Sequence, residues 1–232
     1  MAVENEVDMR WKDLYRIGGI ASVAMAVMIV LAIVAFVFWP FLPGEVSTRE
    51  IFMSIQDNLL GGLMALDFPL LVIELVAIVH FLALYAALKR VNESYALIGL
   101  TLGLIAVTLI IAARPIHEMV YLSEKYTTAE NAVAKARYLA AGEAFHALFN
   151  GTAFLVFTLF IAISGLISSL LMLRSNIFSR ATAVVGIAAT APSLLFFIPK
   201  IGLVMLFVAT IMSIPWLMMQ ARTFIRLGWS LR

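Results

Sequence analysis

Six apolar runs, each near 20 residues long, constrain what this chain can fold into. A bilayer core about 30 Å thick needs about 20 apolar residues of helix to cross it. Backbone polar groups inside lipid must be satisfied within the segment, which favours helices. The sequence therefore predicts an all-α polytopic membrane protein, a six-transmembrane-helix bundle with spans near 17–39, 68–88, 95–113, 147–173, 181–199 and 201–220.

Composition leaves little room for a separate soluble domain. The 232 residues are 63% hydrophobic and 13% charged, whereas soluble domains carry about 25% charged residues. We therefore predict a single integral membrane domain over residues 1–232. The first run is longer than the ~7–15-residue core of a signal peptide and is expected to be a retained span. The chain has no cysteine, which excludes disulfides, thiolate catalysis and iron–sulfur clusters.

The basic residues predict the orientation. Cytoplasmic loops carry an excess of Lys and Arg. One side of the six-span arrangement holds both termini and Arg10, Lys12, Arg16, Lys89, Arg90, Arg174, Arg180, Arg222, Arg226 and Arg232. The other side holds Arg49, Arg114, Lys125, Lys135, Arg137 and Lys200. We predict a cell-membrane protein with cytoplasmic termini, in contact with the lipid bilayer and with no nucleic-acid partner.

Two capping boxes predict helices outside the membrane. The letters S-T-R-E begin at Ser47, and a helix over 48–60 would follow with an apolar stripe through Ile51 and Ile55. This helix is predicted to lie flat at the outer interface and to end at the Gly61-Gly62 pair. The letters T-T-A-E over 127–130 predict a second helix start.

Glycine and proline positions predict how the spans pack. Gly99 and Gly103 form a G-x-x-x-G motif, which permits close backbone approach. Packing inside the bundle is the favoured interpretation, and a homodimer through these two residues is the alternative. Pro192 and Pro215 are expected to kink the last two spans. The two halves show no inverted repeat, which weakens a transporter interpretation.

Ionisable residues concentrate in the second to fourth spans, where each costs on the order of 2.5–3.5 kcal/mol at the membrane centre. The letters G-E-A-F-H-A-L-F-N place Glu143, His146 and Asn150 on one helix face. Counting back from Arg174 puts this face beyond the outer surface, whereas counting in from a hairpin near Tyr126 puts it inside. The candidate ligand-binding residues are Glu74, His80, Arg114, His117, Glu118, Glu143, His146 and Asn150.

Three interpretations of this cluster stay open. The first is structural: Arg114 pairs with Glu118 or Glu143, and Asp67 caps the second span. The second is an outward-facing polar pocket that reaches Glu74 and binds a small or amphiphilic ligand. The third is a metal site.

The candidate metal ligands are His117, Glu143 and His146, with an open position for water. A di-iron bundle fits poorly because it needs two E-x-x-H motifs and two further glutamates. Haem held between His80 and His146 is a weaker hypothesis still, and no cofactor is assigned.

Three stretches in the last third carry a family resemblance: L-M-L-R-S-N-I-F-S-R-A-T-A-V-V-G-I over 171–187, F-I-P-K-I-G-L over 197–203 and P-W-L-M-M-Q-A-R-T-F-I-R-L-G over 215–228. Here the chain resembles prokaryotic six-helix membrane proteins, the family of domain of unknown function 4386. The resemblance covers about 16–228 and implies a basic turn between the fourth and fifth spans. It implies anchoring roles for Arg174, Arg180, Trp216 and Arg222, and brings no activity.

The best functional hypothesis from sequence is the outward-facing ligand pocket. The alternatives are a metal-dependent membrane enzyme at the outer leaflet and a non-catalytic membrane scaffold or accessory subunit.

Overall fold

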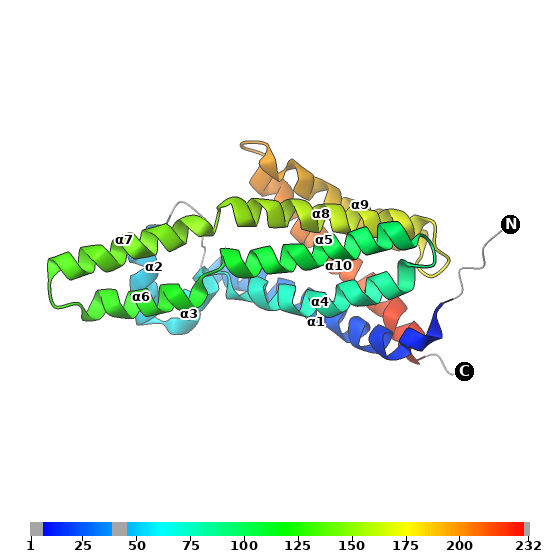
Figure 1. The fold of residues 1–232 in the computed structure, drawn as a ribbon, viewed down its shortest axis with the longest axis horizontal. Coiled ribbons are helices and arrows are strands. Elements are labelled where there is room, and N and C mark those ends of the chain that lie inside the picture. The colour runs from blue at the N-terminus through cyan, green and yellow to red at the C-terminus, as the bar shows by residue number, and fades with distance from the viewer. Residues whose placement is uncertain (1–6, 39–45, 230–232) are drawn as a thin grey trace. The chain divides into compact units, whose positions relative to one another are not determined.

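The computed structural model describes residues 7–38 and 46–229, and the described chain is helical with no strand (Figure 1). The predicted outer end of the first span, Trp39, lies outside the described residues. The α-helices are α1 (Lys12–Phe38), α2 (Thr48–Asp57), α3 (Leu59–Ala65), α4 (Phe68–Leu88), α5 (Glu93–Ala113), α6 (Ile116–Thr128), α7 (Ala132–Leu148), α8 (Thr152–Leu173), α9 (Arg180–Thr190) and α10 (Gly202–Trp229). Two 3₁₀ helices, η1 (Met9–Trp11) and η2 (Ala191–Phe197), precede α1 and follow α9.

Six stretches are long and apolar enough to cross a membrane: Met9–Phe38, Phe68–Leu88, Glu93–Thr128, Ala132–Leu173, Arg180–Phe197 and Gly202–Trp229. The six-helix prediction is confirmed. Large apolar side chains are exposed along α1, α5 and α10, as lipid-facing helices require.

The third and fourth stretches are much longer than a bilayer is thick. Their 36 and 42 residues would extend about 54 and 63 Å as continuous helix. Helix α8 alone has 22 residues, about 33 Å, which is enough to cross. A single bilayer crossing therefore accounts for only part of each of these two stretches.

The fifth span changes helix type at Pro192. Helix α9 has 11 residues, and the chain continues as the seven-residue 3₁₀ helix η2, which carries Pro192 in its first turn. A 3₁₀ helix rises about 2.0 Å per residue, so α9 and η2 together reach about 30 Å. A kink was predicted at this proline, and the change to a 3₁₀ helix observed there lets an 18-residue stretch match the bilayer thickness.

The chain divides into two compact units. The first contains the described residues up to Ile29, Ile73–Val107 and the chain from Phe157 onward. Its core includes Tyr15 stacked on Phe224, with ring centroids 6.3 Å apart. Both predicted packing glycines are buried in this unit: Gly103 lies against the Phe81 ring, and Gly99 lies against Ile167. The predicted packing within the bundle is therefore observed.

The second unit contains Val30–Val72 and Thr108–Val156. Here α2 packs against α6 and α7, and we call these three helices the helical head. Ile51, Phe52 and Ile55 of α2 are buried in its core. An interfacial helix would place this stripe against lipid, whereas protein covers it in the structure.

The predicted start of α2 is confirmed, and its predicted end is wrong. Ser47 and Glu50 form the capping box, with the Ser47 backbone N–H donating to Glu50 Oε2 at 2.8 Å. The helix stops at Asp57 because Asn58 starts a new one: its side chain accepts hydrogen bonds from the N–H groups of Leu60 and Gly61. The Gly61-Gly62 pair lies inside α3.

The second predicted capping box is also wrong. Thr127 and Thr128 belong to the last turn of α6, and both hydroxyls donate back to the carbonyl of Glu124. Helix α7 is capped by Asn131, whose side chain accepts from the Ala134 N–H at 2.9 Å. Threonine hydroxyls bond to preceding carbonyls as readily as they cap, and here that alternative prevails.

Candidate functional site

Arg114 lies at the break between α5 and α6. Pro115 cannot continue the α5 hydrogen-bond ladder, so the chain bends there. The Arg114 side chain is only 4% exposed, and its Nε and Nη2 atoms donate to Oδ2 of Asp67 at 3.1 and 3.0 Å. Arginine can make this two-point contact because its guanidinium is a planar fork.

The remaining surface of the guanidinium is also occupied. Nη1 donates to the backbone carbonyl of Phe149 at 2.9 Å and to that of Ala113 at 3.3 Å. The rings of Phe149 and Phe154 lie 5.1 and 4.7 Å from its central carbon, within cation–π range. Arg114 is therefore held from several sides by the protein.

Three helix breaks meet at this arginine. Asp67, with φ of 62°, joins α3 to α4, and Phe149 begins the segment that joins α7 to α8. Arg114 lies at the third break and bonds to both of the others. It thus connects the start of the second membrane-length stretch to the points at which the third and fourth stretches are interrupted.

The predicted partners of Arg114 are wrong. The structural interpretation paired Glu118 or Glu143 with it and gave Asp67 only the role of capping the second span. Because Pro115 ends α5, Glu118 belongs to the separate helix α6, where it is exposed. An acidic residue directly before one span and a single arginine directly after the next span lie at the same end of the two spans. This is the sequence signal that could have identified the true pair.

The face predicted for α7 divides in two. His146 is half-buried against α2, with Nδ1 3.1 Å from the Thr48 hydroxyl. Gly142 points the same way, because a Cβ built there would collide with the tip of the Phe52 ring. Glu143 and Asn150 are exposed. The contact with α2 is centred on Gly142 and Phe149, which turns Glu143 and Asn150 away from it.

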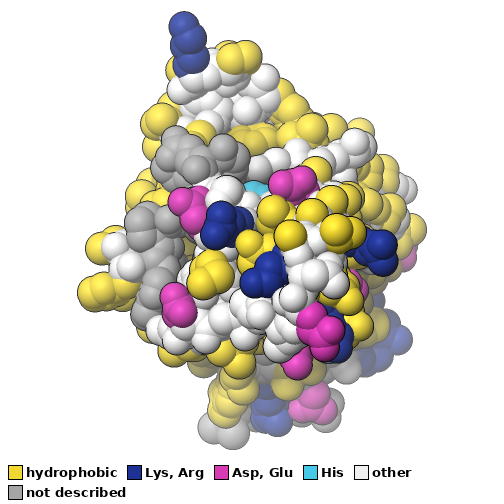
Figure 2. Space-filling view, turned by 90° about the vertical axis from the view of Figure 1, so that its left-hand side faces the viewer, with side chains coloured by type: hydrophobic (Ala, Val, Ile, Leu, Met, Phe, Trp, Pro, Cys, Tyr) yellow, Lys and Arg dark blue, Asp and Glu magenta, His cyan; other side chains and the backbone are white. Residues whose placement is uncertain are grey.

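The structure does not assemble the predicted metal ligands. His117 is exposed on α6, Glu143 is exposed on α7, and His146 bonds to Thr48. Over the described ranges, no group of three His, Asp or Glu side chains is placed to hold a metal ion. Helices α6 and α7 form a hairpin, and the end of this hairpin shows charges of both signs scattered among apolar side chains (Figure 2).

His80 and Glu74 belong to the first unit and are both buried on α4, at 2% and 6% exposure. The Ser22 hydroxyl donates to the Gly18 carbonyl at 2.7 Å, so its oxygen is left to accept from Nδ1 of His80 at 2.8 Å. This network assigns the proton to Nδ1. The rings of Phe81 and Phe224 make T-shaped contacts with the imidazole, as in a satisfied core histidine.

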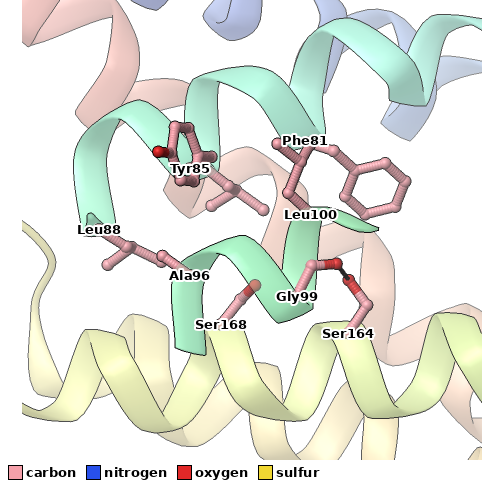
Figure 3. A pocket seen from close by; sticks show the side chains of 9 residues that line it. Phe81, Tyr85, Leu88, Ala96, Gly99, Leu100, Ser164 and Ser168 are labelled. Carbon is pink, nitrogen blue, oxygen red and sulfur yellow. Dashed lines mark hydrogen bonds between the residues drawn. The ribbon is translucent and has the colours of Figure 1, made fainter. Parts of the chain in front are cut away.

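A small cleft in the first unit has no counterpart in the sequence predictions. Phe81, Leu84, Tyr85, Leu88, Ala96, Gly99, Leu100, Ser164 and Ser168 line it (Figure 3). Ser164 Oγ donates to the carbonyl of Gly99 at 2.7 Å across one wall. The space is about 10 Å³, room for about one water molecule.

Asp8 is a second ionic centre that sequence reasoning missed. Its carboxylate is 3% exposed and lies 3.0 Å from Arg10 Nε, 3.3 Å from Lys89 Nζ and 3.9 Å from Arg90 Nη2. Hydrogen bonding from Arg10, reinforced by Lys89, holds the pKa of Asp8 well below its usual range. The cluster fastens η1 to the end of α4, and Lys89 also lies over the Trp11 ring.

Comparison with known proteins identifies a family but assigns no activity. The search of curated proteins and the search of solved structures each gave no match. The family described as Domain of unknown function (DUF4386) matches residues 17–225, close to the extent that the resemblance predicted. This match, over most of a chain with six membrane-length helices, shows that the protein belongs to the DUF4386 family.

Proposed function

We propose that this protein is a non-catalytic accessory subunit or scaffold of the plasma membrane, whose helical head contacts a partner protein. The observation that carries the proposal is the closed environment of Arg114. Arg114 is the most buried charged residue of the predicted cluster in the second unit. Asp67, Phe149 and Phe154 surround its guanidinium group. Such a centre holds helices in place and leaves no obvious position for a substrate.

The surface of the head supplies features of a contact site. Val133 is 71% exposed and Tyr121 is 51% exposed on the hairpin, beside exposed charges of both signs. Exposed apolar groups with a polar surround mark interaction surfaces, and tyrosine is enriched in them. The partner that this surface fits is the extramembrane part of another membrane protein.

Photo-crosslinking in native membranes tests the proposal. A photoreactive amino acid is placed at Val133 or Tyr121, with Val184 of α9, 58% exposed, as the lipid-facing control. We expect the same discrete protein adduct from both head positions and none from Val184. Lipid adducts alone at all three positions would argue against a protein partner.

The charge distribution supports cytoplasmic termini and a head on the outer face. The absence of cysteine makes this testable, because single cysteines can be introduced at exposed positions. We expect a membrane-impermeant maleimide to label Glu130→Cys in intact cells, and to label Ser94→Cys only after permeabilisation. The reverse pattern would invert the proposed topology.

Ligand binding at a pocket that reaches Glu74 is the second candidate function. The observation that favours it is a carboxylate buried to 6% exposure in a membrane-length apolar helix. Such groups usually mark a polar pathway or site. Glu74→Gln would then abolish ligand-dependent thermal stabilisation in a metabolite screen while leaving the crosslinks of the head unchanged.

A further inference from the structure

The last part of the chain carries cations without any acidic residue. After Glu143 the sequence contains no Asp or Glu, although it contains Arg174, Arg180, Arg222 and Arg226. All four are exposed, and all belong to the first unit. Their positive charge therefore has no counterpart nearby in sequence.

The fold gathers these arginines around the turn between α8 and α9. Arg174 follows the last residue of α8, and Arg180 is the first residue of α9. Arg226 of α10 donates from Nη2 to the carbonyl of Ile177 in the middle of this turn, at 3.3 Å. Arg222 lies one helical turn before Arg226 on the same face of α10. In Figure 1 the turn is yellow and the end of α10 is red.

This arrangement is electrostatically unfavourable without an anion. Like charges spaced i, i+4 on a helix, such as Arg222 and Arg226, destabilise it by about 0.2–0.5 kcal/mol. The side chains of Arg180 and Arg222 make no hydrogen bond or ion pair to any part of the chain that the structure describes. A bound anion would relieve the repulsion and use these free donors.

The surroundings of the cluster indicate an anion that carries apolar chains. Helices α8 and α9 have membrane-spanning composition and end at this turn, so the arginines lie at headgroup depth. Directly on the membrane side of the turn, large apolar side chains are exposed: Leu170 (53%), Leu173 (38%) and Val184 (58%). Acyl chains would cover these side chains while the guanidinium groups bind the headgroup.

We propose that Arg174, Arg180, Arg222 and Arg226 form a binding site for the phosphate of an anionic phospholipid. Arginine binds phosphate through two parallel N–H···O bonds, which makes it better suited than lysine to hold a headgroup in one orientation. The occupant is a lipid of the leaflet that contains this end of the helices. A basic site between spans at the membrane surface is a known form of headgroup recognition.

Native mass spectrometry of the full chain tests the proposal. The protein is released from micelles during a titration with phosphatidylglycerol, and in parallel with phosphatidylcholine. We expect retained phosphatidylglycerol and weak retention of phosphatidylcholine. Because each basic residue near an anionic surface contributes about 1 kcal/mol, Arg180→Gln with Arg222→Gln should raise the apparent Kd about 25-fold.

Matched variants make the result interpretable. Arg180→Lys with Arg222→Lys keeps the charge, and we expect it to recover part of the affinity. Lys135→Gln with Arg137→Gln removes two exposed cations of the helical head and should leave the affinity unchanged. Equal unfolding temperatures of all variants without lipid would show that each is folded.

Three results would overturn the proposal. The first is equal retention of phosphatidylcholine, and the second is an equal loss of affinity in the head control. The third is retention of inorganic phosphate in the absence of lipid, which would assign the cluster to a free anion.

Discussion

The guanidinium of Arg114 donates two hydrogen bonds to a single carboxylate oxygen of Asp67, at 3.0 and 3.1 Å, across 47 residues of sequence. Arg114 is almost fully buried, whereas the Asp67 side chain is 39% exposed. Removing Asp67 would therefore leave a buried charge without its partner, whereas removing Arg114 would leave a partly exposed one. A buried charge without its partner is far costlier than an exposed one.

Removing Asp67 should therefore destabilise the protein more than removing Arg114. We expect Asp67→Asn, which removes the charge and tolerates the positive φ of this position, to lower the free energy of unfolding by about 2–3 kcal/mol, below the ~3–5 kcal/mol of a fully buried pair because water screens Asp67. Arg114→Met, which keeps apolar contact with Phe149 and Phe154, should lose less. Thermal unfolding in detergent measures both, with exposed Arg137→Gln as the control. A larger loss in Arg114→Met than in the Asp67 variant would mean that Arg114 acts mainly through its bonds to backbone carbonyls.

Helix α2 packs against α7 at Gly142. A Cβ there would collide with the Phe52 ring, so Gly142→Ala should displace α2 and cost about 1–3 kcal/mol of overpacking. Limited trypsin digestion reports this, because Arg49 on α2 should be cleaved faster. The matched control is Ala140→Leu on the exposed side of α7, and the smaller Phe52→Leu should restore protection in the double variant. Unchanged cleavage in Gly142→Ala would show that α2 is not held by this contact.

The sequence predicted the helices better than it predicted their partners. Span length, apolar composition and the local spacing of Ser47 and Glu50 are short-range properties, and the structure bears out the six membrane-length helices and this cap. The pairing of Arg114 with Asp67 depends on how separate helices meet, which periodicity does not encode. The interpretation that placed Arg114 with Glu118 failed because it assumed a helix continuing through Pro115.

The polar face predicted for α7 also shows that helical periodicity does not encode which residues contact a neighbouring helix. Helical spacing placed Glu143, His146 and Asn150 within about 60° of one another, which is a real property of the sequence. Which part of that arc meets a neighbour was decided by Gly142, a residue without a side chain, because only there can the Phe52 ring approach. A glycine in a helix is thus a stronger indicator of a contact than the polar residues beside it.

The capping box of α2 should make the helical head sensitive to acid. Hydrogen bonds from the Ser47 backbone N–H and hydroxyl lower the pKa of Glu50 from 4.5. A lowered folded-state pKa means that the stabilisation is complete above about pH 4.5 and is lost as the pH falls through the folded-state value. Amide hydrogen exchange of α2, corrected for the intrinsic rate, should show protection falling below pH 4.5.

Two variants separate the cap from general acid effects. Ser47→Ala should lose about 1 kcal/mol of protection at pH 7. Glu50→Gln should remove most of the change in protection below pH 4.5. A pH dependence that persists in Glu50→Gln would assign the acid response to another carboxylate.

The two glycines of the G-x-x-x-G motif should respond to alanine in opposite directions. A Cβ at Gly103 would lie 3.0 Å from three atoms of the Phe81 ring, which cannot move aside as a flexible chain end could. A Cβ at Gly99 would have its nearest contact at 3.4 Å, from Ile167, which is ordinary packing. Gly103→Ala should therefore lower the unfolding temperature, whereas Gly99→Ala should hold or raise it, since alanine favours helix by about 1 kcal/mol.

The same pair of variants tests the homodimer, which was the alternative interpretation of the motif. If Gly99 and Gly103 mediate association of two chains, both substitutions should shift the protein toward monomer in light scattering of the detergent complex. If their role is packing within one chain, the oligomeric state should stay constant while only Gly103→Ala loses stability. A loss of stability in Gly99→Ala alone would contradict both accounts, because the space beside Gly99 accepts a methyl group.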